Sequence, residues 1–227
     1  MSGNASGFGI DAMVERLRFA SVLRVDVFEE KLTQNVGERT VVRDLLAEGA
    51  AALMLASGGF QVEMSDCPDL LLEYSGQSIG AEVKHFRLKR QDEIDEARLL
   101  AGVGDYLVEF GDALPIEGKT AWDQVADVAK RKAPQQRGDC PNLLVILSSS
   151  IGCIDGSAAM TAADVLNVAP ARRACPQLSR LNGLMLMSAE FRFASQRSVH
   201  FFDLSPSNLE LLSDARAALG GIREWAW

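Results

Sequence analysis

The sequence predicts an α/β fold in which a mixed central β-sheet is flanked by helices. Apolar residues recur with helical spacing in some segments and alternate as in strands in others. These segments follow one another as helix, three strands, helix, strand, helix, two strands and helix. With 227 residues, 48% of them hydrophobic, the chain is long enough to bury a core without disulfides or a structural metal. We therefore expect a single domain spanning residues 1–227.

The N-terminal part is predicted to be helical. Residues 10–36 form a helical extension, because apolar residues recur at helical spacing from Ile10 to Leu17. An alternation of apolar and charged residues over 23–27 is a competing strand signal. Residues 39–57 give a clearer helix, rich in alanine and leucine and stopped by two glycines.

The hydrophobic period changes at residue 60, where three short segments have strand spacing: 60–64, 69–74 and 79–87. A turn-like Ser-Asp-Cys-Pro separates the first two, and Ser-Gly-Gln-Ser separates the last two. Because the second turn is short, the second and third strands are expected to be antiparallel neighbours.

The remaining elements follow from the same patterns. Three of the helices are predicted from capping boxes, in which a serine or threonine precedes an acidic residue by three positions. These elements are a charged helix at 90–104, an amphipathic helix at 121–133 capped by Thr120 and Asp123, a buried all-apolar strand at 142–150, a short helix opened by Thr161-x-x-Asp164, a strand pair at 183–191 and 198–204, and a last helix capped by Ser207-x-x-Glu210 and ending at Gly220-Gly221.

Composition excludes several classes of protein. The 23 basic and 31 acidic residues give a formal net charge of −8, which argues against a general nucleic-acid coat but not against a local site. The four cysteines are widely spaced, and the two histidines are far from any ligand pattern, so a zinc site is not expected. The N-terminus does not resemble a signal peptide, and no apolar run is long enough to cross a bilayer. We expect a soluble cytoplasmic protein without a membrane partner.

Three charged residues lie on the predicted hairpin. Asp69 opens the second strand, and Glu82 and Lys84 are two apart on the third, so they share one face of the sheet. Val83 between them points into the core. Charged groups among apolar neighbours must be paired, solvated or metal-bound. Clustered carboxylates suit Mg²⁺ or Mn²⁺, which can activate water for attack on a phosphoryl group, and a lysine can neutralise the charge that develops.

Pro68-Asp69, twelve further residues and then Glu82-Val83-Lys84 resemble the PD-(D/E)xK signature of the restriction-endonuclease-like nucleases. The resemblance covers about residues 39–149 and implies an α-β-β-β-α-β core, with the C-terminal strands and helix, 183–219, outside it. It implies a Mg²⁺- or Mn²⁺-dependent nuclease that acts on DNA. In such a site Asp69 and Glu82 bind the metal, the Val83 carbonyl completes its shell and Lys84 assists the attacking water.

Two further residues follow from the same resemblance. Many members carry a glutamate on the helix before the strands, and Glu48 lies at the centre of an apolar face of the 39–57 helix. It is therefore a candidate ligand or supporting group. Related nucleases also often carry a lysine or glutamine after the next helix, where Gln135 and Gln136 stand.

Basic residues are grouped locally despite the acidic total. We interpret two runs as nucleic-acid contacts, because one directly follows the proposed ligands and the other lies along the amphipathic helix; a solvated protein surface is the alternative. The predicted contacts are Arg87, Lys89, Arg90, Lys130, Arg131 and Lys132.

Other interpretations of the chain stay open. Asp69 and Lys84 could form a salt bridge on a solvated sheet face. The fold could have lost catalysis and serve as a binding or assembly module, as the −8 charge suggests. Residues 113–120 fit a loose phosphate-binding-loop pattern, but alanine replaces its first glycine, the loop contains a proline, and Glu117 lies where a phosphate would sit. Trp225 and Trp227 either pack back on the domain or contact a homodimer or protein partner.

Acid-x-lysine triplets also occur elsewhere in the chain. Glu29-x-Lys31 lies in the predicted N-terminal helical region, and Glu117-x-Lys119 lies in a predicted loop. Neither follows a strand that opens with Pro-Asp. Only the Glu82 triplet therefore has the hairpin that the nuclease signature requires.

Overall fold

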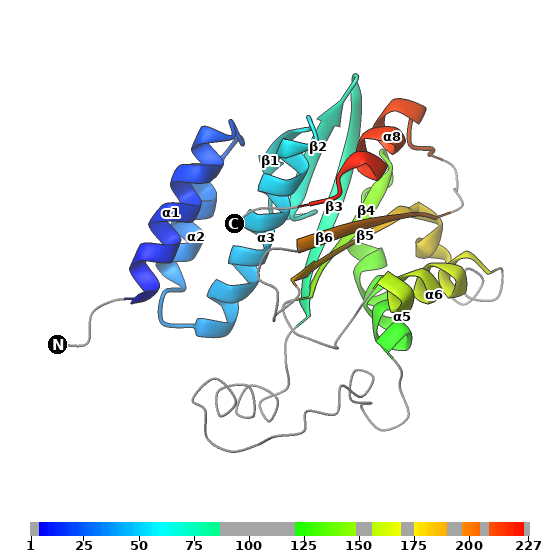
Figure 1. The fold of residues 1–227 in the computed structure, drawn as a ribbon, viewed down its shortest axis with the longest axis horizontal. Helices are drawn as coiled ribbons and strands as arrows, with labels where there is room; N and C mark the ends of the chain where they lie inside the picture. Colours follow the sequence, from blue (N-terminus) through cyan, green and yellow to red (C-terminus); the bar gives the residue numbers. More distant parts are fainter. Residues whose placement is uncertain are drawn as a thin grey trace, which may run out of the picture.

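The computed structural model describes residues 5–86, 121–148, 156–168, 175–189, 197–204 and 209–224. Its centre is a six-stranded sheet in which the strands lie in chain order (Figure 1). The strands are β1 Gln61–Met64, β2 Leu70–Tyr74, β3 Gln77–Phe86, β4 Asn142–Ser148, β5 Leu181–Ala189 and β6 Arg197–Asp203.

The sheet is mixed. β1, β2 and β3 form an antiparallel meander, whereas β4 runs parallel to both β3 and β5. β6 closes the sheet antiparallel to β5. The predicted α/β class with a mixed central sheet flanked by helices is therefore confirmed.

Helices cover both faces of the sheet (Figure 1). α3 packs against β1 and β3, with α1 and α2 beside it, while α5 packs against α6 on the other side. Among the described residues, no helix is long and apolar enough to cross a membrane. The helices are α1 Ala5–Phe19, α2 Val25–Gln34, α3 Arg39–Ser57, α5 Ala121–Lys132, α6 Gly156–Asn167 and α8 Ser213–Gly221, with short 3₁₀ turns at Ala133–Gln135 and Pro176–Arg180.

β4 separates two hydrophobic clusters. Leu143, Val145 and Leu147 pack with α1–α3 and α8, whereas Leu144 and Ile146 pack with α5 and α6. Every residue of β4 is buried, because successive side chains point to opposite faces and both faces are covered. This accounts for the continuous apolar run in the sequence.

The β2–β3 hairpin has the turn that the sequence predicts. Ser75 and Gly76 have φ of 49° and 77°, so they form a two-residue turn of the primed kind, whose twist matches that of the strands. The register pairs Leu70 with Ala81. Continuing that register brings Asp69, just before β2, opposite Glu82.

The N-terminal extension is helical, as predicted, but it is interrupted. Leu23 lies between α1 and α2 and pairs with the outer edge of β1, with hydrogen bonds to Val62 and Met64 of 2.8 and 3.1 Å. The strand-like alternation over 23–27 thus corresponds to one bridge, and α2 begins at Val25.

Two predicted helix starts were wrong. α6 begins at Gly156, so Thr161 lies inside the helix instead of capping it. α8 begins only at Ser213, because the Gln77 side chain binds the Glu210 carbonyl and the Leu212 N–H, which holds this segment outside the helix. Several predictions fall outside the described residues: the 90–104 helix, the Thr120 cap, the 113–120 loop and the two C-terminal tryptophans.

Candidate functional site

Asp69 lies directly before β2, and the neighbouring strand β3 holds it in place. The Val83 N–H donates a hydrogen bond of 2.7 Å to Oδ2 of Asp69. The Ser65 N–H donates to the Asp69 carbonyl and closes the loop before the strand. The Asp69 side chain is 17% exposed, so it lies at the rim of the sheet. The hydrogen bond from the Val83 N–H holds the Asp69 carboxylate beside β3.

Glu82 is the buried member of the site. Its side chain is only 3% exposed, on the sheet face that α5 covers. Burial raises the pKa of the Glu82 carboxyl, and the charge of the adjacent Asp69 raises it further. We refer to Asp69 and Glu82 as the carboxylate pair.

The remaining residues of the signature divide between the two faces of β3. Val83 is buried in the cluster beneath α3, as predicted. Lys84 shares the face of Glu82 and is half-buried. Within the described ranges, Lys84 forms no hydrogen bond or ion pair. His85 lies on the α3 side, opposite Lys84, and faces Asp44 at 3.7 Å.

Glu48 approaches the pair from α3. Burial raises the pKa of its carboxyl to about 8, and the charge of Asp69 is the next contribution. Among the described residues, no three histidine, cysteine, aspartate or glutamate side chains converge as a metal-binding group. Of the predicted ligands, the structure places Asp69 and Glu82 side by side. Glu48 is close enough to interact electrostatically with Asp69 and Lys132.

The cation at the carboxylate pair is Lys132, the last residue of α5. Its Nζ lies 2.7 Å from Oε2 of Glu82 and 3.7 Å from Oδ2 of Asp69. Burial by itself lowers the pKa of Lys132, but the hydrogen bond to Glu82 and the charge of Asp69 outweigh it, and the pKa is raised. Lys132 is therefore a charged ammonium group bound to both carboxylates.

Sequence reasoning assigned Lys132 to a basic run and not to this site. The missed signal is its helical phase. Val128 and Ala129 are buried, and Lys132 follows them by four and three positions, so it continues the buried stripe of α5. Lys130 is half-buried, whereas Arg131 points to solvent.

Lys31 is a second lysine near the site. It forms an ion pair with Asp66 and donates to the Ser65 carbonyl over 3.3 Å, which ties α2 to the loop before Asp69. Its charge also lowers the pKa of Glu48, against the larger effect of burial. The Glu29-x-Lys31 triplet lies in helix α2 and lacks a strand, as its sequence context indicates.

The glutamines after α5 do not contact the carboxylate pair through any hydrogen bond among the described residues. The Gln135 side chain is exposed, and its carbonyl accepts a 3.5 Å hydrogen bond from the Cys67 Sγ. Gln136 is 3% exposed, and its side-chain amide has no hydrogen-bond partner within the described part of the chain. Lys132 thus reaches the site from the region where the resemblance implied a lysine or glutamine.

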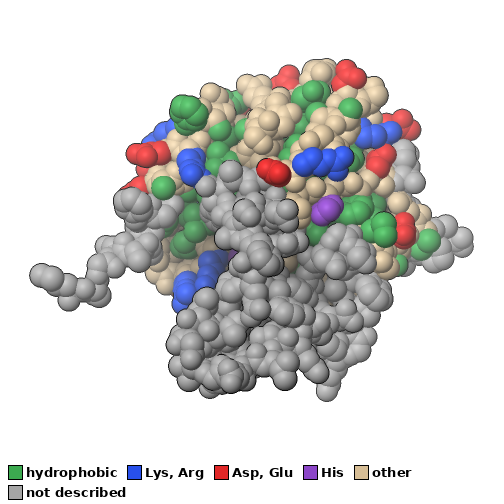
Figure 2. Space-filling view, viewed as in Figure 1, with side chains coloured by type: hydrophobic (Ala, Val, Ile, Leu, Met, Phe, Trp, Pro, Cys, Tyr) green, Lys and Arg blue, Asp and Glu red, His purple; other side chains and the backbone are tan. Residues whose placement is uncertain are grey.

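The predicted nucleic-acid contacts lie partly outside the described residues, namely Arg87, Lys89 and Arg90. On the surface in view, basic and acidic side chains are interspersed (Figure 2). Salt bridges such as Arg18–Glu29 and Arg137–Asp139 pair several of them. These pairs reduce the basic surface that the described residues offer to phosphate.

No family model, curated protein or solved structure matches this chain. The candidate site therefore rests on its own geometry.

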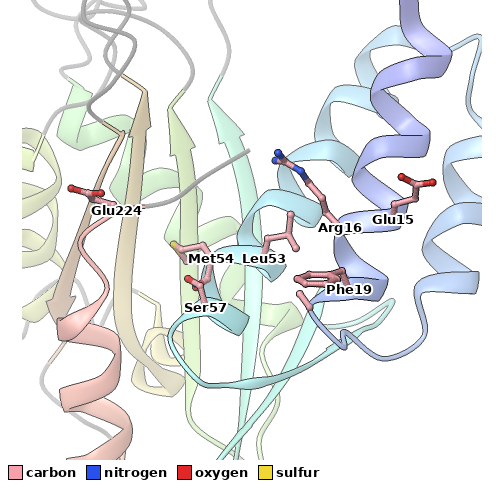
Figure 3. Close-up of a pocket in the computed structure, with 8 residues that line it drawn as sticks. Glu15, Arg16, Phe19, Leu53, Met54, Ser57 and Glu224 are labelled. Carbon is pink, nitrogen blue, oxygen red and sulfur yellow. The ribbon is translucent and has the colours of Figure 1, made fainter.

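A cavity of about 660 Å³ lies away from the carboxylate pair, between α1 and α3 (Figure 3). Phe19, Leu53 and Met54 give it an apolar lining, and Glu15, Arg16 and Glu224 add charge. None of the residues that the sequence predicts as catalytic or metal-binding lines it. The cavity and the carboxylate pair therefore share no residue.

Replacing Glu48 by glutamine is expected to stabilise the protein at alkaline pH. The folded state keeps the Glu48 proton up to a pKa of about 8, whereas the unfolded state loses it near the ordinary value of 4.5. The wild type therefore loses stability as the pH rises between these values, and glutamine cannot ionise. The stability gained by Glu48→Gln should grow to the order of a few kcal/mol above about pH 8.

Urea denaturation over a pH series in metal-free buffer measures this difference. Glu73→Gln, at an exposed position of β2, controls for loss of a glutamate charge. A Glu48→Gln effect that is constant with pH, or that grows toward acid, would show that Glu48 is not held protonated by the fold.

Proposed function

We propose that the protein is a Mg²⁺- or Mn²⁺-dependent nuclease that hydrolyses phosphodiester bonds in DNA. The observation that carries the proposal is the carboxylate pair, which is held side by side with a cation already bound between its oxygens. Two clustered carboxylates are the donor set that hard divalent cations prefer. A divalent cation would also bring more positive charge to the buried Glu82 than one ammonium group does, and burial penalises the ionised form of Glu82.

The order of elements supports the same proposal. Among the described elements, α3 is followed by the antiparallel β1–β3 meander, then α5, and then β4 parallel to β3. This succession agrees with the α-β-β-β-α-β order that the resemblance to the restriction-endonuclease-like nucleases implies. In this arrangement Asp69 and Glu82 come from adjacent strands and Glu48 comes from the helix on the opposite face.

The proposed chemistry divides among the residues of the site. A divalent cation would supply Lewis acidity and lower the pKa of a bound water. Asp69 and Glu82 would hold it, and the Val83 N–H keeps the Asp69 carboxylate in position. Lys84, which has no ion-pair partner among the described residues, would orient the attacking water or neutralise charge on the phosphoryl oxygens.

A catalytically inactive binding or assembly module is the second candidate. The observation in its favour is the Lys132 ammonium, which already forms ion pairs with both carboxylates. This candidate predicts no divalent-cation binding at Asp69 and Glu82. A calorimetric Mn²⁺ titration of the wild type that gives a binding heat, lost in Glu82→Gln, would exclude it.

The nuclease proposal is tested with a panel of plasmid, linear, single-stranded and branched DNA. We expect cleavage of at least one form with Mg²⁺ or Mn²⁺ and none with EDTA. Cleavage that persists in EDTA would contradict the metal-dependent mechanism, and the form cut fastest identifies the substrate class.

A further inference from the structure

We propose that Lys132 competes with the divalent cation for the carboxylate pair, so that metal binding displaces its ammonium group. The inference rests on the proposed metal site and goes beyond it, because it assigns control of metal affinity to a residue outside the nuclease signature. Lys132 lies in α5, 50 residues beyond Glu82.

The contacts place the ammonium where it must compete. Nζ of Lys132 donates to Oε2 of Glu82 at 2.7 Å and lies 3.7 Å from Oδ2 of Asp69, the oxygen that also accepts the Val83 N–H. A cation bound by both carboxylates needs oxygens that the ammonium now occupies. Two positive charges cannot share this space without strong repulsion.

Burial explains why a cation is present there at all. The Glu82 side chain is 3% exposed, and a buried carboxylate without a partner costs several kcal/mol. The ammonium supplies the missing charge and a hydrogen bond. A divalent cation would satisfy the same requirement, so either one can stabilise Glu82, and the two exclude each other.

Lys132 can also leave the site without unfolding its helix. It is the last residue of α5, and its side chain is 23% exposed. Its four-carbon stem is flexible, so the ammonium can move to solvent while the backbone of α5 stays in place. Displacement therefore costs one charge-assisted contact, and this cost weakens the apparent metal affinity.

The test is a calorimetric Mn²⁺ titration of the full-length wild type and of Lys132→Met, a variant of similar length without charge. We expect Lys132→Met to bind Mn²⁺ roughly tenfold more tightly or better, because no charge-assisted hydrogen bond has to be broken first. Arg131→Met is the matched control. This variant removes one positive charge from the exposed position directly before Lys132, and its affinity for Mn²⁺ should stay close to that of the wild type.

Each outcome separates the inference from the proposed function. If the wild type binds Mn²⁺ and Lys132→Met binds no more tightly, the competition is refuted and the metal site stands. If neither protein binds Mn²⁺, both the metal site and the competition are refuted. If Arg131→Met gains as much as Lys132→Met, the effect is one of overall charge and the inference fails.

A second measurement applies if the Lys132→Met protein does not fold in the absence of metal. Because Mn²⁺ would replace the ammonium beside Glu82, added Mn²⁺ should restore the folded circular-dichroism spectrum of the variant. A variant that stays unfolded in saturating Mn²⁺ would overturn the exchange of the two cations.

Discussion

Replacing Glu82 by glutamine is expected to reduce metal-dependent DNA cleavage by about 10³-fold or more. Metal catalysis contributes several kcal/mol, and each 1.4 kcal/mol is about tenfold in rate. Glutamine keeps the volume of the buried side chain and an oxygen that can accept the hydrogen bond from Lys132. The fold should therefore persist while the charge that holds the metal is lost. Single-turnover cleavage, measured beside thermal unfolding, separates the two effects.

The control for this change is Glu73→Gln on the neighbouring strand. Glu73 is exposed on β2, so its replacement removes the same charge from the sheet without touching the carboxylate pair. Its cleavage rate should equal that of the wild type. A Glu82→Gln protein that is folded and cuts at the wild-type rate would remove Glu82 from the mechanism.

Replacing Lys84 by alanine is expected to reduce cleavage by about 10²- to 10³-fold, the usual effect of removing one group that stabilises charge in the transition state. Lys84 has no hydrogen bond or ion pair among the described residues, so its removal should leave the unfolding midpoint nearly unchanged. Cleavage rate and thermal midpoint, measured on the same preparation, test both parts.

Lys84 should therefore contribute to the cleavage rate, whereas Lys132 should contribute to the stability of the metal-free protein. Lys132 neutralises a buried carboxylate, so its removal should lower stability in metal-free buffer, whereas removal of Lys84 should not. If Lys84→Ala cuts normally while Lys132 variants are inactive, the lysine of α5 is the catalytic one and the role assigned to Lys84 is wrong.

Local patterns predicted the framework of this fold well. Alternating side chains and a two-residue turn specify the β2–β3 hairpin, and the turn sets its register. The continuous apolar run of β4 predicted a strand covered on both faces, as the two clusters confirm. These features depend on residues that are near one another in the chain.

Features that depend on contacts between residues far apart in the sequence could not be predicted from local patterns. The sequence leaves a salt bridge between Asp69 and Lys84 open as an alternative, but the lysine that pairs with Asp69 is Lys132, because α5 packs over the Glu82 face of β3. Only the helical phase of α5 indicated that Lys132 is turned inward. The start of α8 likewise depends on Gln77, which is 135 positions before Leu212. Capping motifs alone therefore misplaced the starts of α6 and α8.

The most direct test of the central claim is DNA cleavage by Asp69→Asn beside the wild type with Mn²⁺. Asparagine keeps an oxygen that can accept the Val83 N–H, so the hairpin should stay intact while one metal-binding charge is lost. We predict cleavage by the wild type, and a folded variant that releases no product. Equal cleavage by the two proteins, or a wild type that cuts no form of DNA with either metal, would contradict the nuclease assignment.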